Sequence, residues 1–309
     1  MELLERARGC LLGLAAGDAV GTTVEFKPRG SFTPLTDMVG GGPFGLQPGQ
    51  WTDDTSMALC LGYSLDECGG FDAHDQMTRY VRWWREGYLS STGRCFDIGV
   101  TVSGALSTFQ RTGDPFAGAT DPRTAGNGCI MRLAPIALFY YPDIDAAERY
   151  AAESARTTHG AAECLDASRL LARMLVRALA GAAKAEILTG EAATFTGAPR
   201  IVAIARGDYH DKPASQIRGA GYVVDCLEAA LWCFERTANF RDAVLLAANL
   251  GDDADTTAAV CGQLAGAYYG ASGIPTDWLA KLTLETEIEA LAERLVHRAH
   301  HVTATTALP

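Results

Sequence analysis

The sequence predicts an all-α protein, and three observations lead to that fold class. Apolar residues recur mostly at spacings of three and four, which is typical of helices that bury one face. Alternating strand patterns are scarce, and the best strand candidate, "RIVAIA" at 200–205, is short. Breaks rich in glycine and proline separate the periodic segments. These breaks lie at 28–50, 111–128, 190–199 and 270–275.

The expected helices follow these breaks along the chain. One begins after Thr52, where a possible N-cap precedes the apolar run of "WTDDTSMALCLGYSL". The later periodic segments are 162–183, 221–236, 241–250, 254–271 and 286–300. No break is long or polar enough to be an interdomain linker, so we expect a single compact domain over 1–302. Residues 303–309 are expected to be a frayed tail.

Composition narrows the functional classes. The chain has 309 residues, 48% of them hydrophobic, and a net charge of −11. This acidic balance argues against a nucleic-acid surface, which needs a basic face. Nine cysteines without a CxxC pair argue against a disulfide framework or a zinc site and fit a reducing cytoplasm. The apolar N-terminal stretch ends at Asp18, too soon for a membrane span, so we expect no membrane partner. A monomer is the default expectation.

Two runs of small residues stand near the two ends of the chain. They are "GLAAGDAVG" at 13–21 and "GQLAGAYYG" at 262–270. Glycine and alanine allow helix backbones to approach closely, so these runs are interpreted as close helix packing.

Acidic and hydroxyl residues are concentrated in two distant stretches, "WTDDT" at 51–55 and "GDDADTT" at 251–257. Each precedes an apolar helix, where the helix dipole favours a carboxylate by about 0.3–1 kcal/mol. This effect accounts for one aspartate at each stretch but not for five. Packed carboxylates repel one another, and a hard divalent cation would relieve the repulsion. Oxygen ligands without nearby His or Cys suit Mg²⁺ or Mn²⁺. Capped, solvated helix ends and a metal site therefore both remain open.

Seven segments together make the chain resemble the ADP-ribosylglycohydrolase family. In chain order they are "GCLLGLAAGDAVGTTVEF" (9–26), "GQWTDDTSMAL" (49–59), "CFDIGVTV" (95–102), "GNGCIMRLAPIAL" (126–138), "TTHG" (157–160), "GYVVDCLEAALWCF" (221–234) and "GDDADTTAAVCGQLAGAYYG" (251–270). Each is weak alone, but all seven in family order are highly specific. "CFDIG" and "GYVVDCLEAALW" favour the bacterial branch that reactivates dinitrogenase reductase.

The resemblance implies a compact orthogonal multi-helix bundle with a cleft that holds two Mg²⁺ or Mn²⁺ ions. The matched ligand positions are Thr52, Asp53, Asp54, Asp253, Asp255 and Thr256. Asp252 precedes the matched positions and is left out as a helix-entry residue. In this interpretation the first turns of two helices that are distant in sequence lie together and bind the same two metal ions.

The resemblance also implies an enzyme that removes ADP-ribose from modified protein side chains, with arginine as the favoured linkage and ADP-ribose as product. Asp97 and Glu25 match the carboxylates beside the reacting ribose and the metals. Gly126, Asn127 and Gly128 match a phosphate loop, whose backbone N–H groups would form an anion nest. His159 matches a histidine on the ADP side of the cleft. Their alternatives are a cap or loop role for Asp97, a solvated Glu25 and a structural His159.

Tyr222 is a candidate for stacking on adenine, with helix packing as the alternative. Three other functions remain open: a family hydrolase for serine-linked or small-molecule ADP-ribose conjugates, a non-catalytic ADP-ribose-binding module, and a two-metal phosphoester hydrolase. All six ligand positions are intact, which disfavours the binding module.

Overall fold

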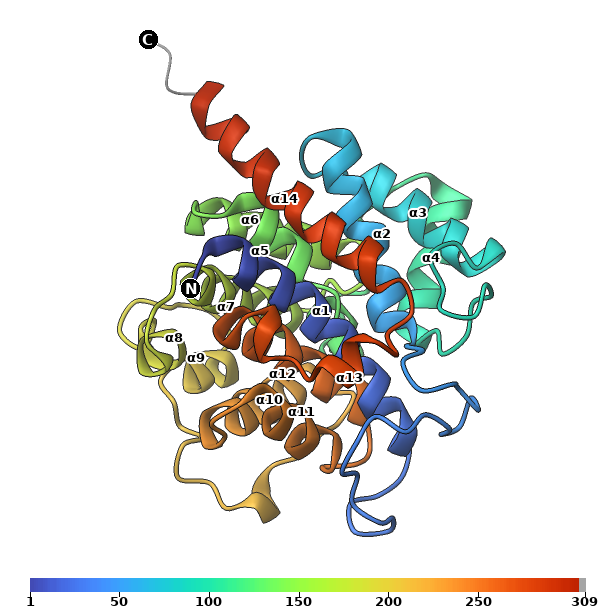
Figure 1. The fold of residues 1–309 in the computed structure, drawn as a ribbon. Coiled ribbons are helices and arrows are strands. Elements are labelled where there is room, and N and C mark those ends of the chain that lie inside the picture. The colour runs from blue at the N-terminus through green and yellow to red at the C-terminus, as the bar shows by residue number, and fades with distance from the viewer. Residues whose placement is uncertain (306–309) are drawn as a thin grey trace.

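The structure, a computed structural model, describes residues 1–305, with side chains through residue 298. Fourteen α-helices form this part of the chain (Figure 1). The first seven are α1 (Leu3–Gly21), α2 (Asp53–Cys68), α3 (Ala73–Glu86), α4 (Val100–Thr112), α5 (Ala134–Tyr140), α6 (Ile144–Arg156) and α7 (Ala162–Leu179). The others are α8 (Lys184–Thr189), α9 (Pro199–Ala205), α10 (Val223–Arg236), α11 (Phe240–Ala248), α12 (Ala254–Tyr269), α13 (Thr276–Leu279) and α14 (Glu285–Thr305). The all-α prediction is confirmed.

Helices α1 and α12 pack side by side in the middle of the bundle (Figure 1). Four glycines at every fourth position of α1 make the contact: Gly9, Gly13, Gly17 and Gly21. A Cβ atom on any of them would lie 2.2–2.4 Å from a carbonyl oxygen of α12. The expected close packing of the two small-residue runs is therefore confirmed.

The pairing of α1 with α12 is antiparallel, and this direction places the functional stretch. Gly9 contacts Gly266 near the end of α12, whereas Gly21 contacts Ala254 at its start. The end of α1 therefore lies beside the first turn of α12, although more than two hundred residues separate them in sequence.

The acidic stretch at 51–55 reaches the same place through α2. This helix contributes to two apolar clusters: Leu59 and Leu61 lie in the main core, while Met57 and Cys60 pack with α3 and α4. Because α2 is held from both sides, its first turn has a fixed position beside α1.

The strand expected at 200–205 is wrong. These residues form α9, which begins with Pro199 in its first turn. Ile201 and Ile204 are buried three residues apart, a helical spacing, and α9 packs on α7 and α10. Within residues 1–305 bridging is limited to three isolated pairs, so no strand is present for this segment to join. Tertiary packing thus overrides its weak β preference.

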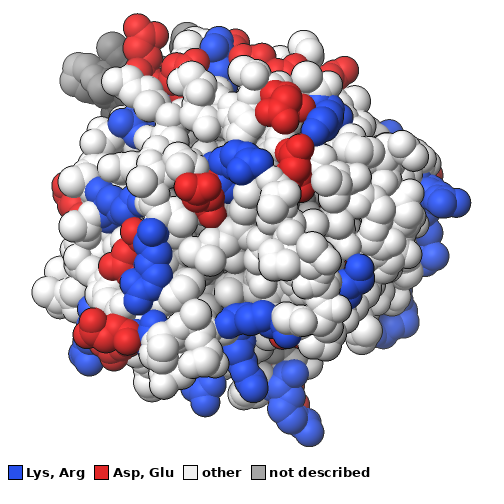
Figure 2. Space-filling view, turned by 60° about the horizontal axis from the view of Figure 1, so that its bottom comes forward, with Lys and Arg blue, Asp and Glu red and all other residues white. Residues whose placement is uncertain are grey.

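Of the tail expected at 303–309, residues 303–305 belong to α14, and residues 306–309 lie outside the described part. Across the described residues, none of the helices combines the length and the apolar character needed to cross a membrane. On the face shown in Figure 2, basic and acidic side chains lie singly or in small groups between uncharged areas.

Candidate functional site

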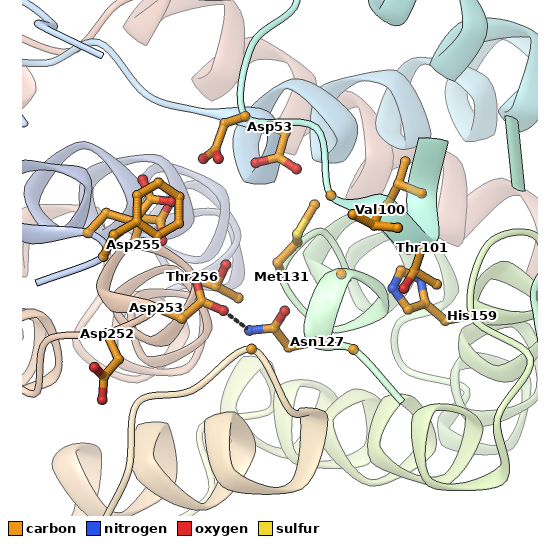
Figure 3. Close-up of a pocket in the computed structure, with 18 residues that line it drawn as sticks. Asp53, Val100, Thr101, Asn127, Met131, His159, Asp252, Asp253, Asp255 and Thr256 are labelled. Carbon is orange, nitrogen blue, oxygen red and sulfur yellow. Dashed lines mark hydrogen bonds between the residues drawn. The ribbon is translucent and has the colours of Figure 1, made fainter. Parts of the chain in front are cut away.

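A cavity of about 570 Å³ opens where the starts of α2, α4 and α12 meet (Figure 3). Its size falls within the range of small-molecule sites. The residues that line it come from segments far apart in the sequence. They are Glu25, Phe26, Asp53, Asp97, residues 99–102, residues 126–128, Met131, His159, Gly221, residues 252–253 and residues 255–256. Most of the residues predicted from the sequence therefore line one cavity.

The two acidic stretches meet at the floor of this cavity. The Thr256 hydroxyl lies 3.3 Å from Asp54 Oδ2, 202 residues away in sequence. The Thr52 hydroxyl lies 3.3 Å from Asp255 Oδ2. Asp54 and Asp255 are 1% and 2% exposed, so these are buried carboxylates and not solvated helix ends.

Asp18 anchors this floor, and the sequence analysis did not predict its role. Its Oδ1 accepts hydrogen bonds from the N–H and the hydroxyl of Thr52, and its Oδ2 accepts the same pair from Thr55. An aspartate on α1 thus caps α2, while the Thr52 side chain does not cap its own helix. The available signal was one carboxylate inside the otherwise apolar run at 9–24.

Burial raises the pKa of every carboxyl group in the cluster. For Asp53, Asp54 and Asp255 the pKa lies well above its usual range, because burial and neighbouring carboxylates both disfavour the charge. Burial also raises the pKa of Asp18 to about 6, against the effect of its four hydrogen bonds.

Three observations fit a cation at this floor. Oδ1 of Asp54 and Oδ1 of Asp255 are buried without a hydrogen-bond partner. The Thr52 hydroxyl has a single proton, yet three carboxylates lie within 2.9–3.4 Å of it. The surrounding donor set is carboxylate and hydroxyl oxygen, which suits Mg²⁺ or Mn²⁺. The buried acidic cluster therefore has the chemistry of a divalent-metal site.

Glu25 and Asp97 line the cavity beside Asp255. Each offers a carboxylate oxygen that, with one from Asp255, forms a group within 4.8 Å. Glu25 is 3% exposed, so the alternative of a solvated glutamate is wrong. Burial and the charges of Asp97 and Asp253 raise the pKa of Glu25 to about 9. Burial and the charges of Asp18 and Asp253 raise the pKa of Asp97 to about 7.

The glycine loop reaches the cavity, but much of its expected donor capacity is already used. The N–H of Gly126 donates to Thr124, and the N–H of Asn127 donates to Gly221. The Asn127 side chain donates to Asp253 Oδ2 at 2.6 Å, which ties the loop to the acidic floor (Figure 3). The anion nest predicted across Gly126, Asn127 and Gly128 is therefore wrong for its first two N–H groups.

The start of α4 is a further part of the site that was not predicted from the sequence. Gly99 is its N-cap, and residues 99–102 line the cavity. The first N–H groups of a helix have no intrahelical acceptor, so this end offers hydrogen-bond donors to an anion. The sequence signal was a glycine before the run "VTVSGAL".

His159 and Tyr222 differ in their placement. His159 is 2% exposed, and its ring lines the cavity. Burial and the charge of Arg132 lower the pKa of His159 to about 3, so the ring is neutral. Tyr222 is not among the described residues that line the cavity. It is the N-cap of α10, and its hydroxyl donates to Glu163 at 2.5 Å.

Known proteins are similar to this chain over nearly its whole length. A model of the family described as ADP-ribosylglycohydrolase matches residues 1–304. The chain is 49% identical to "ADP-ribosylarginine hydrolase Tri1" of Pseudomonas putida over 99% of this chain and 82% of the relative. It is 35% identical to "ADP-ribosyl-[dinitrogen reductase] glycohydrolase" of Rhodospirillum rubrum, over 92% of each chain. A solved "ADP-ribosylglycohydrolase-related protein complex" superposes with a TM-score of 0.84 at 46% identity, covering 96% of this chain and 99% of that one.

Proposed function

Since this chain belongs to the ADP-ribosylglycohydrolase family, we propose that it hydrolyses the N-glycosidic bond between arginine and C1 of the distal ribose of ADP-ribose. The observation that carries the proposal is the buried, oxygen-only acidic cluster at the floor of a ligand-sized cavity. The arginine linkage is taken from the relatives named ADP-ribosylarginine hydrolase at 45–49% identity.

The proposed metal ligands are Thr52, Asp53, Asp54, Asp253, Asp255 and Thr256, around two Mg²⁺ or Mn²⁺ ions. Bound divalent ions would supply Lewis-acid stabilisation and orient the ribose hydroxyls. Asp18 holds Thr52 and Thr55, and Asn127 holds Asp253, so the ligands are fixed before any substrate binds.

Hydrolysis breaks the C1–N bond, adds the hydroxyl of water to C1 and returns a proton to the guanidine nitrogen. Glu25 and Asp97 are the proposed acid–base pair. Burial favours the protonated form of both groups, as a general acid requires, and the bound cations would oppose this effect. Both line the cavity beside Asp255, a position that suits contact with the distal ribose.

The ADP side of the substrate would lie toward α4. The proposed donors to its diphosphate are the first N–H groups of α4, the Gly128 backbone and the His159 ring. A Cβ on Gly128 would lie 2.7 Å from His159 Cε1, so glycine at this position leaves room for the imidazole in the cavity wall. The nine free thiols suit a reducing compartment, and we place the enzyme in the cytoplasm.

The test compares three substrates: arginine-linked and serine-linked ADP-ribosyl peptides and a small ADP-ribose ester. Each is incubated with Mg²⁺, Mn²⁺ or EDTA, and released ADP-ribose is quantified by chromatography. We expect release from the arginine peptide with either metal and none with EDTA. Preferential release from the serine peptide or the ester would replace the arginine assignment. Tight ADP-ribose binding without release from any substrate would identify a binding module.

Asp255→Asn provides the matched negative variant for that assay. It keeps the size of the side chain and removes one anionic oxygen from the floor. Asp121→Asn is its control, because Asp121 caps a surface turn with an oxygen that asparagine retains. Loss of release in Asp255→Asn alone supports the proposed floor chemistry.

A further inference from the structure

Arg132 is a buried cation outside the acidic floor. It follows the glycine loop, and its side chain is 0% exposed. Within the described residues no carboxylate lies within ion-pair distance of it. Its guanidinium instead faces the Tyr80 ring, with 4.7 Å from Cζ to the ring centroid. Burying an arginine without an acidic partner is costly, so a specific contact should account for its position.

The shortest hydrogen bond of the guanidinium goes to the hydroxyl of Thr158, and Nη2 also lies 3.5 Å from the Ser154 carbonyl oxygen. Arg132 Nη2 donates to Thr158 Oγ1 at 2.7 Å, and the same oxygen lies 2.8 Å from His159 Nδ1. Thr158 is 0% exposed. Arginine, a hydroxyl and an imidazole thus form one short buried chain that ends at the cavity.

The direction of each hydrogen bond in this chain follows from the donors available. A guanidinium only donates, so Thr158 Oγ1 accepts from Arg132. The hydroxyl proton then has Nδ1 of His159 as its acceptor. If Nδ1 carried a proton instead, the buried Thr158 hydroxyl would have no acceptor among the described contacts, at a substantial cost. Nδ1 is therefore the acceptor, and the ring proton resides on Nε2.

Nε2 faces the glycine loop and the cavity. A Cβ on Gly128 would lie 3.1 Å from Nε2, and a Cβ on Gly126 would lie 3.4 Å from it. The His159 backbone is held by a 2.7 Å hydrogen bond from its N–H to Ala155. The ring is thus fixed in position and carries an N–H at the cavity wall, next to the α4 start (Figure 3).

We propose that Arg132 is a positioning residue that acts through Thr158 to lock His159 as the neutral Nε2–H tautomer, so that the ring donates one hydrogen bond to an anionic oxygen of the bound diphosphate. The identity of the ligand rests on the proposed function, but the tautomer does not. The low pKa of His159 agrees with a donor that stays neutral across the working pH range. A neutral donor would contribute the same hydrogen bond at pH 6 and at pH 9.

The decisive variant is Thr158→Val, which keeps the shape and removes the hydroxyl. Thr158→Ser keeps the hydroxyl. Thr157→Val is the matched control, since Thr157 is equally buried but its hydroxyl bonds to Ser154 and not to His159. Arg132→Met removes the donor itself and is the direct variant if it folds.

Two measurements on the full metal-loaded chain test the proposal. The first is ¹⁵N NMR of the histidine ring nitrogens, with the His159 signals assigned by their loss in His159→Gln. We expect a pyrrole-type Nε2 and a pyridine-type Nδ1 in the wild type, Thr158→Ser and Thr157→Val. In Thr158→Val we expect loss of the single tautomer. A wild-type ring protonated at Nδ1 would overturn the proposal.

The second measurement is calorimetric titration with ADP-ribose. A hydrogen bond to a charged group contributes about 1.5–3 kcal/mol, so its loss in Thr158→Val corresponds to a Kd about 13- to 160-fold weaker. In the release assay KM should rise by a similar factor while kcat stays within about twofold. An unchanged Kd in Thr158→Val would overturn the proposal. Absence of turnover with an intact tautomer would count against the proposed function alone.

Discussion

The carboxylate of Asp18 receives both the N–H and the hydroxyl of Thr52, each at 2.9 Å, across 34 residues of sequence. The same carboxylate receives the equivalent pair from Thr55. One buried side chain on α1 therefore fixes the first turn of α2, on which two of the proposed metal-binding aspartates stand. The floor of the cavity depends on a residue that need not itself touch a metal.

Asp18→Asn should weaken both the fold and the proposed metal site. An amide nitrogen cannot accept the hydrogen bonds that one carboxylate oxygen accepts now, so buried donors would lose their partners. We expect the free energy of unfolding to fall by about 1–3 kcal/mol and metal affinity to fall about 10- to 100-fold. Urea unfolding and Mn²⁺ titration measure the two effects.

Asp72→Asn is the control for this variant. Asp72 caps α3 through a hydrogen bond from Asp75 N–H, and asparagine caps nearly as well. Its unfolding free energy should stay near that of the wild type. If Asp18→Asn were as stable as Asp72→Asn and bound metal normally, the anchoring role of Asp18 would be refuted.

The metal-free protein should lose stability as pH rises. The folded-state pKa values of Asp18, Asp97 and Glu25, about 6, 7 and 9, all lie above the ordinary carboxyl values. The folded form therefore holds protons that the unfolded form releases, so the stability these groups contribute is present below about pH 4 and lost as pH rises to about 9. Melting temperatures in EDTA should fall from pH 5 to pH 9.

Mg²⁺ or Mn²⁺ should remove most of this fall in melting temperature with pH, because a bound cation neutralises the negative charge of the carboxylates. An ion that binds only the folded state adds RT ln(1 + [L]/Kd), about 2.7 kcal/mol at a hundredfold excess over Kd. The same pH series with metal is the comparison. Coincident curves with and without metal would mean that the buried cluster does not bind these ions.

Asp97→Asn should separate catalysis from binding. Asp97 has a φ of 59°, a left-handed conformation that asparagine tolerates, so the loop should keep its shape. If the carboxylate handles a proton, kcat should fall about 10²- to 10⁴-fold while the Kd for ADP-ribose changes less than about tenfold. Single-turnover release and calorimetry measure both. Equal losses would make Asp97 a binding residue, and an unchanged rate would move the acid–base role to Glu25.

Gly17→Ala should separate α1 from α12. Its Cβ would lie 2.2 Å from the Ala258 carbonyl oxygen, with backbone on both sides and no flexible side chain to move. We expect a loss of at least about 1–3 kcal/mol in unfolding free energy and weaker metal binding, since Asp18 and Asp255 sit on the displaced helices. Thermal and urea unfolding measure the loss.

Gly104→Ala is the matched helix-glycine control. It lies on an exposed face of α4 with nothing within 4 Å of its Cβ position. There the substitution should stabilise the helix by about 0.5–1 kcal/mol. Equal behaviour of the two alanine variants would show that close approach of α1 and α12 is not required.

The helical fold class, the small-residue packing runs and most of the residues that line the cavity could be predicted from the sequence alone. Helical periodicity and clustered carboxylates are local patterns, and the seven family segments needed no coordinates. Local patterns also limited what could be foreseen. "RIVAIA" has residues that suit either a strand or a helix. This segment forms the helix α9 because it packs on α7 and α10.

The pairing of hydrogen-bonding groups could not be predicted in this way, because it depends on how the helices pack in three dimensions. Asp18 reaches Thr52 because the first turn of α2 packs beside α1. The N–H of Asn127 donates to Gly221, 94 residues further along the chain, so it cannot donate to an anion. Arg132, Thr158 and His159 likewise form a chain through space. A sequence shows which side chains can donate or accept a hydrogen bond, but burial removes water as the alternative partner, and burial is set by the packing of distant helices.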